Sequence, residues 1–102
     1  MRLEHYPVKR LKKEVLEIVA KHLDISEYRV FFFGSRVSGK GDERSDIDIG
    51  IEGKEKIAGK IMADIQEDID SLPILYKIEI VDFKAILPKF KEVACQSMEI
   101  IT

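Results

Sequence analysis

The chain has 102 residues, a common size for one domain and enough to bury a hydrophobic core. Apolar residues make up 45% of it and charged residues 35%, as in soluble globular proteins. The net charge of −2 gives no general attraction to nucleic acid, the single Cys95 cannot form an internal disulfide, and no apolar run is long enough to span a membrane. We therefore expect one soluble domain, residues 1–102, in a reducing cytoplasm.

The first half of the chain predicts a helix and two strands. Apolar residues recur at helical spacing across Val8–Leu23. The run YRVFFFG predicts a strand that is buried on both faces and ends at Gly34. The run SDIDIGI alternates strictly, so a strand there would carry Asp46 and Asp48 on one face and three isoleucines on the other.

The second half predicts a helix, a strand and a helix. Four isoleucines spaced by four residues indicate a helix over roughly 54–71, and PILYKIEIVDF at 73–83 indicates a third strand. Pro88 suits the first turn of a last helix that includes Phe90, Val93 and Ala94. The pattern does not decide whether MEIIT, at 98–102, is a final strand or the last turn of that helix. The order α-β-β-α-β-α predicts an α/β (α+β) fold with a small mixed sheet covered by helices on one side.

The glycine-rich loop at 34–41 resembles a phosphate-binding P-loop at first sight, because Gly34 to Lys40 fits G-x-x-x-x-G-K. Three features argue against that assignment. Gly41 stands where the magnesium-binding Ser or Thr would be, the following GDERSD is turn-like and runs into a strand, and the chain is short for the usual large parallel sheet.

An ordinary glycine turn is the stronger rival, since most such turns have no chemical role. The next strand weighs against it, because Asp46 and Asp48 would lie about 6–7 Å apart on one face. Two like charges at that spacing repel each other and raise the carboxylate pKa values. An exposed edge strand could tolerate the pair, but a divalent-metal site explains it better, because Mg²⁺ prefers carboxylate and phosphate oxygens.

These residues also carry a family resemblance. Gly34-Ser35, about ten further residues and then Ser45-Asp46-Ile47-Asp48 resemble the G-S-x(8–13)-[DE]-x-[DE] signature of the DNA polymerase β-like nucleotidyltransferase superfamily. The match is closest to its minimal members, which are similar in length and order of elements, so the resemblance covers nearly the whole chain. It implies the polymerase β-like palm fold.

The resemblance implies transfer of a nucleoside monophosphate from a triphosphate, with ATP expected, to an acceptor hydroxyl. Two Mg²⁺ ions would activate the attacking oxygen and stabilise the leaving one. Asp46 and Asp48 would supply two of the three catalytic and metal-binding carboxylates. The third falls on Glu79, where the family usually has Asp; Asp82 is the fallback, although a regular strand would place it on the opposite face.

The same resemblance assigns the nucleotide phosphates to the glycine loop. Gly34 would let the backbone approach a phosphate, and the Ser35 hydroxyl would donate to it. Arg36 and Ser45 are the next nucleotide-binding candidates. Lys40 and Arg44 are equally well explained as solvated loop charges.

Three functions remain open on the sequence alone. Minimal nucleotidyltransferases resemble the antitoxin half of toxin–antitoxin modules, which implies transfer of AMP to a tyrosine of a helical HEPN-type toxin. The chain has little room for an acceptor-binding domain, so a partner or an oligomer would have to complete that surface. The alternatives are a binding module with a vestigial nucleotide site, which the unusual Glu79 keeps open, and a transferase acting on a small molecule or RNA. The lack of a concentrated basic stripe argues against nucleic acid.

Overall fold

The computed structural model describes residues 1–41 and 44–102. The centre of the predicted GDERSD turn, residues 42–43, lies outside the described residues. The elements follow one another as α1 (Val8–His22), a 3₁₀ turn η1 (Ile25–Glu27), β1 (Arg29–Phe33), α2 (Ser35–Ser38), β2 (Ile47–Glu52), α3 (Gly59–Asp70), β3 (Ile78–Asp82), α4 (Pro88–Ala94) and β4 (Met98–Ile100).

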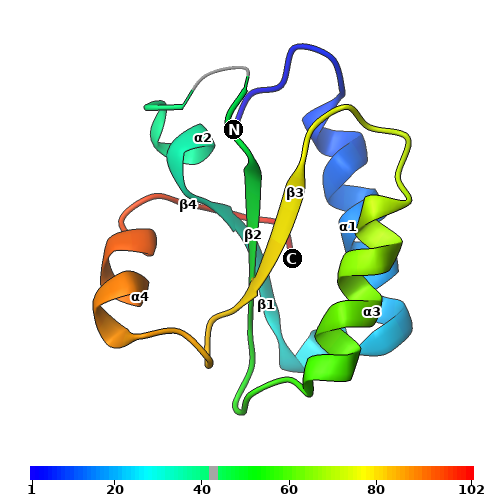
Figure 1. The fold of residues 1–102 in the computed structure, drawn as a ribbon, viewed down its shortest axis with the longest axis vertical. Helices are drawn as coiled ribbons and strands as arrows, with labels where there is room; N and C mark the ends of the chain where they lie inside the picture. Colours follow the sequence, from blue (N-terminus) through cyan, green and yellow to red (C-terminus); the bar gives the residue numbers. More distant parts are fainter. Residues whose placement is uncertain (42–43) are drawn as a thin grey trace.

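The strands form one mixed sheet in the order β3-β2-β1-β4 (Figure 1). β1 is antiparallel to both β2 and β4, whereas β2 and β3 are parallel, as expected for two strands joined through a helix. The predicted small mixed sheet of an α+β fold is therefore confirmed. MEIIT is resolved as a strand, because Met98–Ile100 pairs with β1.

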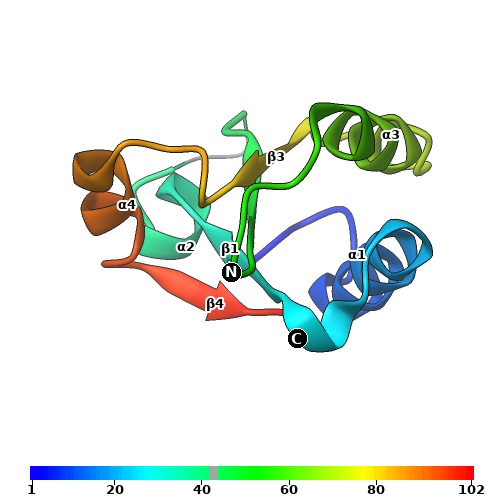
Figure 2. The ribbon, with the colours of Figure 1, turned by 90° about the horizontal axis from the view of Figure 1, so that it is seen from below.

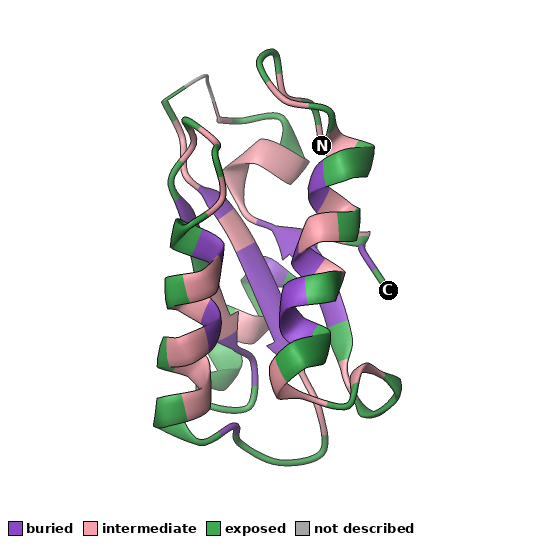
Figure 3. Ribbon diagram, turned by 90° about the vertical axis from the view of Figure 1, so that its right-hand side faces the viewer, coloured by how far each residue is buried: buried purple, intermediate pink, exposed green. Residues whose placement is uncertain are grey.

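One face of the sheet is covered by α1 and α3, which pack side by side against it (Figures 2 and 3). Val30 and Phe32 on β1 point to this face, together with the isoleucines of β2. Each helix contributes an apolar stripe whose members are fully or almost fully buried: Leu11, Val15, Ile18 and Val19 on α1, and Ile65 and Ile69 on α3. This is the predicted helical face, and it makes up the larger core.

The other face is not bare, so the expectation of helices on one side only was wrong. Phe31 and Phe33 alternate with the residues of the first face and join Phe83 and Ala94 in a second core cluster. α4 lies over this face (Figure 2). The physical reason is that Phe31 and Phe83 are large, fully buried rings, and only a second layer can remove them from water.

Two predicted boundaries were too generous. α3 begins at Gly59 rather than near 54; Ile57 is buried ahead of the helix, where its N–H donates to Asp82 Oδ2 over 2.7 Å. β3 begins at Ile78 rather than at Pro73, because residues 71–77 form the turn out of α3. Among the described helices, none is long and apolar enough to cross a membrane.

Candidate active site

The glycine loop contains a short helix that the sequence pattern did not predict. α2 starts directly after Gly34, whose carbonyl accepts hydrogen bonds from the N–H groups of Val37 and Ser38, both 3.1 Å. Gly34 has φ 86° and ψ −163°, a region that is essentially restricted to glycine, and Gly39 ends the helix with φ 80°. The loop is thus a defined turn–helix–turn at the end of β1.

Gly34 is also required for steric reasons. The residue before it, Phe33, is the register partner of Asp48 on β2, so the loop leaves the sheet beside that carboxylate. A Cβ built on Gly34 would collide with the Asp48 carboxylate. A residue with a side chain here would therefore displace either the loop or Asp48.

Gly41 brings the two ends of the loop together. A Cβ at this position would lie 2.8 Å from the hydroxyl oxygens of both Ser35 and Ser45. The Ser35 carbonyl also accepts from the N–H groups of Lys40 and Gly41, at 3.1 and 3.0 Å. Gly41, the residue that argued against a P-loop, is therefore needed for a different reason: its small size lets Ser35 and Ser45 approach each other. Sequence reasoning missed this role, since only the fold shows what faces Gly41.

The predicted carboxylates gather at one end of β2 and β3. Asp48 and Glu79 are register partners on these parallel strands, and Asp46 lies just before β2 rather than within it. Burial, then the charges of Glu79 and Asp46, raise the pKa of Asp48 to about 6. Within the described residues, no group of three His, Cys, Asp or Glu side chains is arranged to hold a metal ion.

Asp82, the fallback for the third carboxylate, lies on the opposite face of β3 and is 7% exposed. Its Oδ2 accepts from the Ile57 N–H, and its Oδ1 accepts from the Lys84 N–H over 3.0 Å. Asp82 therefore connects β3 to the segment before α3 and stays apart from Asp48.

Arg36 is directed toward the loop's own backbone. Its Nε donates to the Ser45 carbonyl over 2.7 Å, and its guanidinium carbon lies 4.7 Å from the centre of the Tyr76 ring. Tyr76 did not figure among the predicted site residues, because no local pattern connects it with a loop forty residues earlier.

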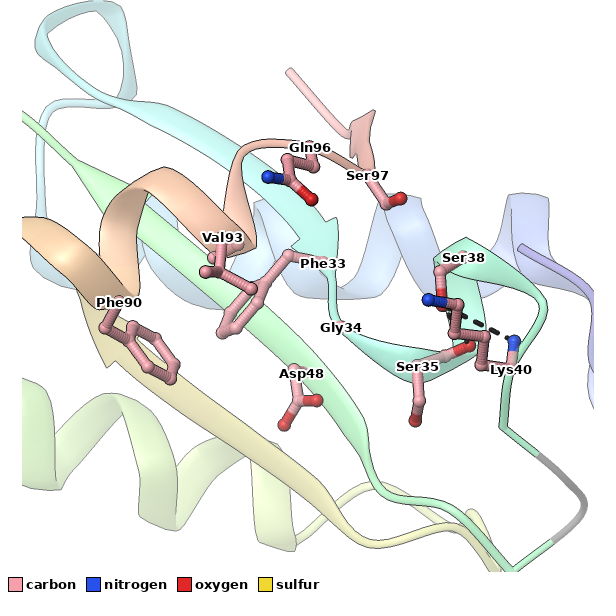
Figure 4. Close-up of a pocket in the computed structure, with 11 residues that line it drawn as sticks. Phe33, Gly34, Ser35, Ser38, Lys40, Asp48, Phe90, Val93, Gln96 and Ser97 are labelled. Atoms are coloured by element: carbon pink, nitrogen blue, oxygen red, sulfur yellow. Dashed lines mark hydrogen bonds between the residues drawn. The ribbon is translucent and has the colours of Figure 1, made fainter.

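A pocket of about 380 Å³ lies beside the glycine loop (Figure 4). Gly34, Ser35 and Asp48 line it together with Lys40, whereas Arg36, Ser45, Asp46 and Glu79 do not. Its other wall comes from β1 and the α4–β4 region, through Phe33, Phe90, Val93, Ala94, Gln96 and Ser97.

The α4 wall was missed as part of the site. Phe90 and Val93 were placed only in the last predicted helix, with no role in the site, but they are 49% and 66% exposed and line the pocket. No sequence signal separates an apolar residue that lines a pocket from one that fills a core.

Comparison with known proteins places the chain in a family. A family model described as polymerase beta, nucleotidyltransferase matches residues 10–102. A protein of Haemophilus influenzae described as probable protein adenylyltransferase MntA is 28% identical over 85 residues, which cover 81% of this chain and 75% of that protein.

Solved structures share the fold at low sequence identity. A chain from a toxin–antitoxin crystal structure with AMP-PNP superposes with a TM-score of 0.71 at 13% identity, covering 89% of this chain and 72% of that one. A chain from a complex of tri-AMPylated Shewanella oneidensis HEPN toxin with MNT antitoxin gives a TM-score of 0.67 at 12% identity, covering 92% and 71%.

Proposed function

The chain belongs to the polymerase β nucleotidyltransferase family, and within it we propose that the protein transfers AMP from ATP to an acceptor hydroxyl on a partner protein. The observation that carries the proposal is the position of Asp48, which shares one pocket with the Gly34–Ser35 loop. A phosphate held by the loop would lie next to a carboxylate of the kind that binds Mg²⁺. The pocket volume is within the usual range for a small-ligand site.

The carboxylates suit a divalent cation by their chemistry. Asp46, Asp48 and Glu79 would hold Mg²⁺, with two ions expected in such a site. Burial, and then the negative charges of Glu79 and Asp46, raise the pKa of Asp48, and a bound cation would offset this cost of ionisation. Bound Mg²⁺ would stabilise phosphate charge and lower the pKa of the acceptor hydroxyl. The side chains must rotate to form the complete site, as catalytic groups often do when substrate binds.

The remaining pocket residues divide between the two parts of a nucleotide. The hydroxyl of Ser35 and the amine of Lys40 would donate to phosphate oxygens, while Gly34 allows the backbone to approach. The Ser45 hydroxyl lies outside the pocket lining, close to Gly41, and would reach a phosphate only from the edge of the loop. Arg36 would contribute positive charge behind the loop. The apolar wall formed by Phe33, Phe90 and Val93 suits the nucleoside, because ligand pockets combine apolar surface with a few directed polar groups.

The acceptor is proposed to be a tyrosine of a HEPN-type toxin, with this chain as the antitoxin. The descriptions of similar proteins support this assignment, since one is a probable protein adenylyltransferase and another comes from a complex of an MNT antitoxin with an AMPylated HEPN toxin. On this chain, Leu87, just before α4, and Phe90 and Val93 on α4 are exposed apolar side chains, and the last two line the pocket. An acceptor delivered by a partner protein would dock beside such a surface.

The decisive experiment is to incubate the purified protein with ATP, Mg²⁺ and its HEPN-type partner and to measure the partner's intact mass. A gain of one or more AMP units is expected, and it should disappear with Asp48→Ala. Asp64→Ala, on the exposed side of α3, serves as the matched control and should transfer normally. If the partner stays unmodified while Asp48→Ala protein still binds and silences it, neutralisation is by contact alone and the proposal fails.

A further inference from the structure

Tyr76 lies in the turn that leads into β3, half-buried, with Arg36 across one face of its ring. The guanidinium carbon is 4.7 Å from the ring centre, a geometry in which the cation is attracted by the π-system. The hydroxyl of Tyr76 accepts from the His5 N–H over 3.1 Å, and the two rings stack with centroids 6.4 Å apart. The ring is therefore held from the N-terminal segment and in turn supports Arg36.

Hydrogen bonds from Arg36 and to Lys77 fix the two peptide groups that flank Asp46. On the N-terminal side, the Ser45 carbonyl accepts from Arg36 Nε over 2.7 Å. On the C-terminal side, the Ile47 N–H donates over 2.9 Å to the carbonyl of Lys77, the residue after Tyr76. These two peptide planes set φ and ψ of Asp46 and hence the direction in which its side chain leaves the backbone.

The first of these two bonds depends on a side chain and the second on the sheet. Parallel pairing of β2 with β3 places Ile47 opposite Ile78, so the Lys77 bond extends the ladder by one residue. The Arg36 bond has no such ladder behind it. It depends on the Arg36 side chain keeping one rotamer, and the Tyr76 ring packs against the guanidinium in that rotamer.

We propose that Tyr76 is a positioning residue for metal binding, which acts through Arg36 to fix the Ser45–Asp46 peptide and with it the direction in which the Asp46 side chain leaves the backbone. The inference rests on the proposed function for its catalytic meaning. It assigns Arg36 a structural bond to the loop in place of a purely ionic contact with phosphate. Partners that orient metal ligands typically change metal affinity by about 10- to 100-fold when they are removed.

The test uses the full chain without nucleotide and two readouts that do not require turnover. Hydrogen exchange of the segment 44–47 reports how firmly the peptide is held, and Mn²⁺ titration followed by electron paramagnetic resonance reports metal affinity. Tyr76→Ala should speed exchange of this segment and weaken Mn²⁺ binding by about tenfold. Tyr76→Phe keeps the ring face and loses only the bond to His5, so it should behave as wild type.

Two further variants keep the result interpretable. Tyr28→Ala removes a tyrosine that packs against Gly53 at the other end of the sheet, and it should leave segment 44–47 and Mn²⁺ binding unchanged. Arg36→Met removes the guanidinium but keeps an apolar chain, and it should reproduce the effect of Tyr76→Ala even if that variant folds poorly.

Normal exchange and normal Mn²⁺ affinity in folded Tyr76→Ala or Arg36→Met protein would overturn the inference. It would also be overturned if these variants raised only the KM for ATP, since Arg36 would then act as a phosphate ligand. The two proposals fail separately. If the wild type transfers no AMP but exchange and Mn²⁺ binding respond as expected, the proposed function is wrong and the positioning role stands.

Discussion

Asp48 lies half-buried on β2 with Glu79 beside it on β3 and Asp46 two residues earlier. Burial and these two charges raise its pKa to about 6. A carboxyl whose pKa is higher in the folded than in the unfolded state opposes folding once it ionises. The penalty is absent below about pH 4, grows as the pH rises and is complete above about pH 6.

Asp48→Asn should therefore raise the melting temperature of the metal-free protein at about pH 7.5 and change it little at about pH 4. We expect a gain of about 1 kcal/mol in the free energy of unfolding at the higher pH, since solvent screens a half-exposed group. Thermal melts at both pH values test this, with Asp64→Asn on α3 as the control. A marked loss of stability at both pH values would identify Asp48 as a structural hydrogen-bonding group instead.

Gly34 permits a second residue-scale test. Gly34→Ala should destabilise the protein by about 1–3 kcal/mol through backbone strain, because the φ and ψ of Gly34 are restricted to glycine. The collision of the new Cβ with the Asp48 carboxylate should add to this loss. Gly59→Ala is the matched control. Gly59 begins α3 with open space around it, so alanine there should be neutral or stabilise by about 0.4–1 kcal/mol. Denaturant unfolding measures both, and equal effects would contradict the strained-glycine account.

Alternation along β3 separates two acidic residues into different roles. Glu79 is exposed on the face that carries Asp48, whereas Asp82 is buried on the face of α3 and accepts two backbone N–H bonds. A strand reverses its side chains at each step, so residues three apart cannot share a face. The alternation of side chains along β3 therefore favours Glu79 over Asp82 as the third carboxylate.

Glu79→Gln should lower AMP transfer by about 10- to 100-fold with little effect on stability, because it removes a charge from the exposed face. Asp82→Ala should have the opposite pattern, with a loss of stability and little effect on AMP transfer. It leaves the N–H groups of Ile57 and Lys84 without their acceptor, which should cost about 1–3 kcal/mol of stability. Denaturation curves and transfer assays on both variants, run at a temperature where both are folded, make the comparison. Normal transfer by Glu79→Gln would remove Glu79 from the proposed metal site.

At the scale of the molecule, the candidate site joins segments that are distant in the chain. The loop after β1, the start of β2 and the α4–β4 region meet around one pocket (Figure 4). A ligand that contacts all three would stabilise the fold as a whole, since it binds the native state and not the unfolded chain.

Mg²⁺ with ATP should therefore raise the melting temperature. At 100 times the dissociation constant the gain is about 2.7 kcal/mol, equivalent to roughly 10–20 °C for a chain of this size. EDTA or Asp48→Asn should remove most of the increment. The rise in melting temperature on adding Mg²⁺ and ATP should also shrink as the pH falls through about 6, because protons compete with the metal for Asp48. An increment that is unaffected by EDTA and by Asp48→Asn would mean that nucleotide binds without the carboxylates.

Several features of this protein follow from local patterns in its sequence. The helical period of α1, the alternation through Asp46 and Asp48 and the glycine at the end of β1 each depend on residues within a few positions of one another. Such patterns express backbone geometry directly, which is why the mixed sheet could be predicted. The association of the carboxylates with the glycine loop was instead implied by the resemblance to the nucleotidyltransferase signature.

Other features depended on contacts between distant segments. The second helical layer forms because Phe31 and Phe33 meet Phe83, and the wall of the pocket forms because α4 returns over that face. The stacking of Arg36 on Tyr76 joins residues forty positions apart. A repeat of 2 or 3.6 residues contains no information about which distant side chain will be a neighbour, so only tertiary packing could determine these contacts.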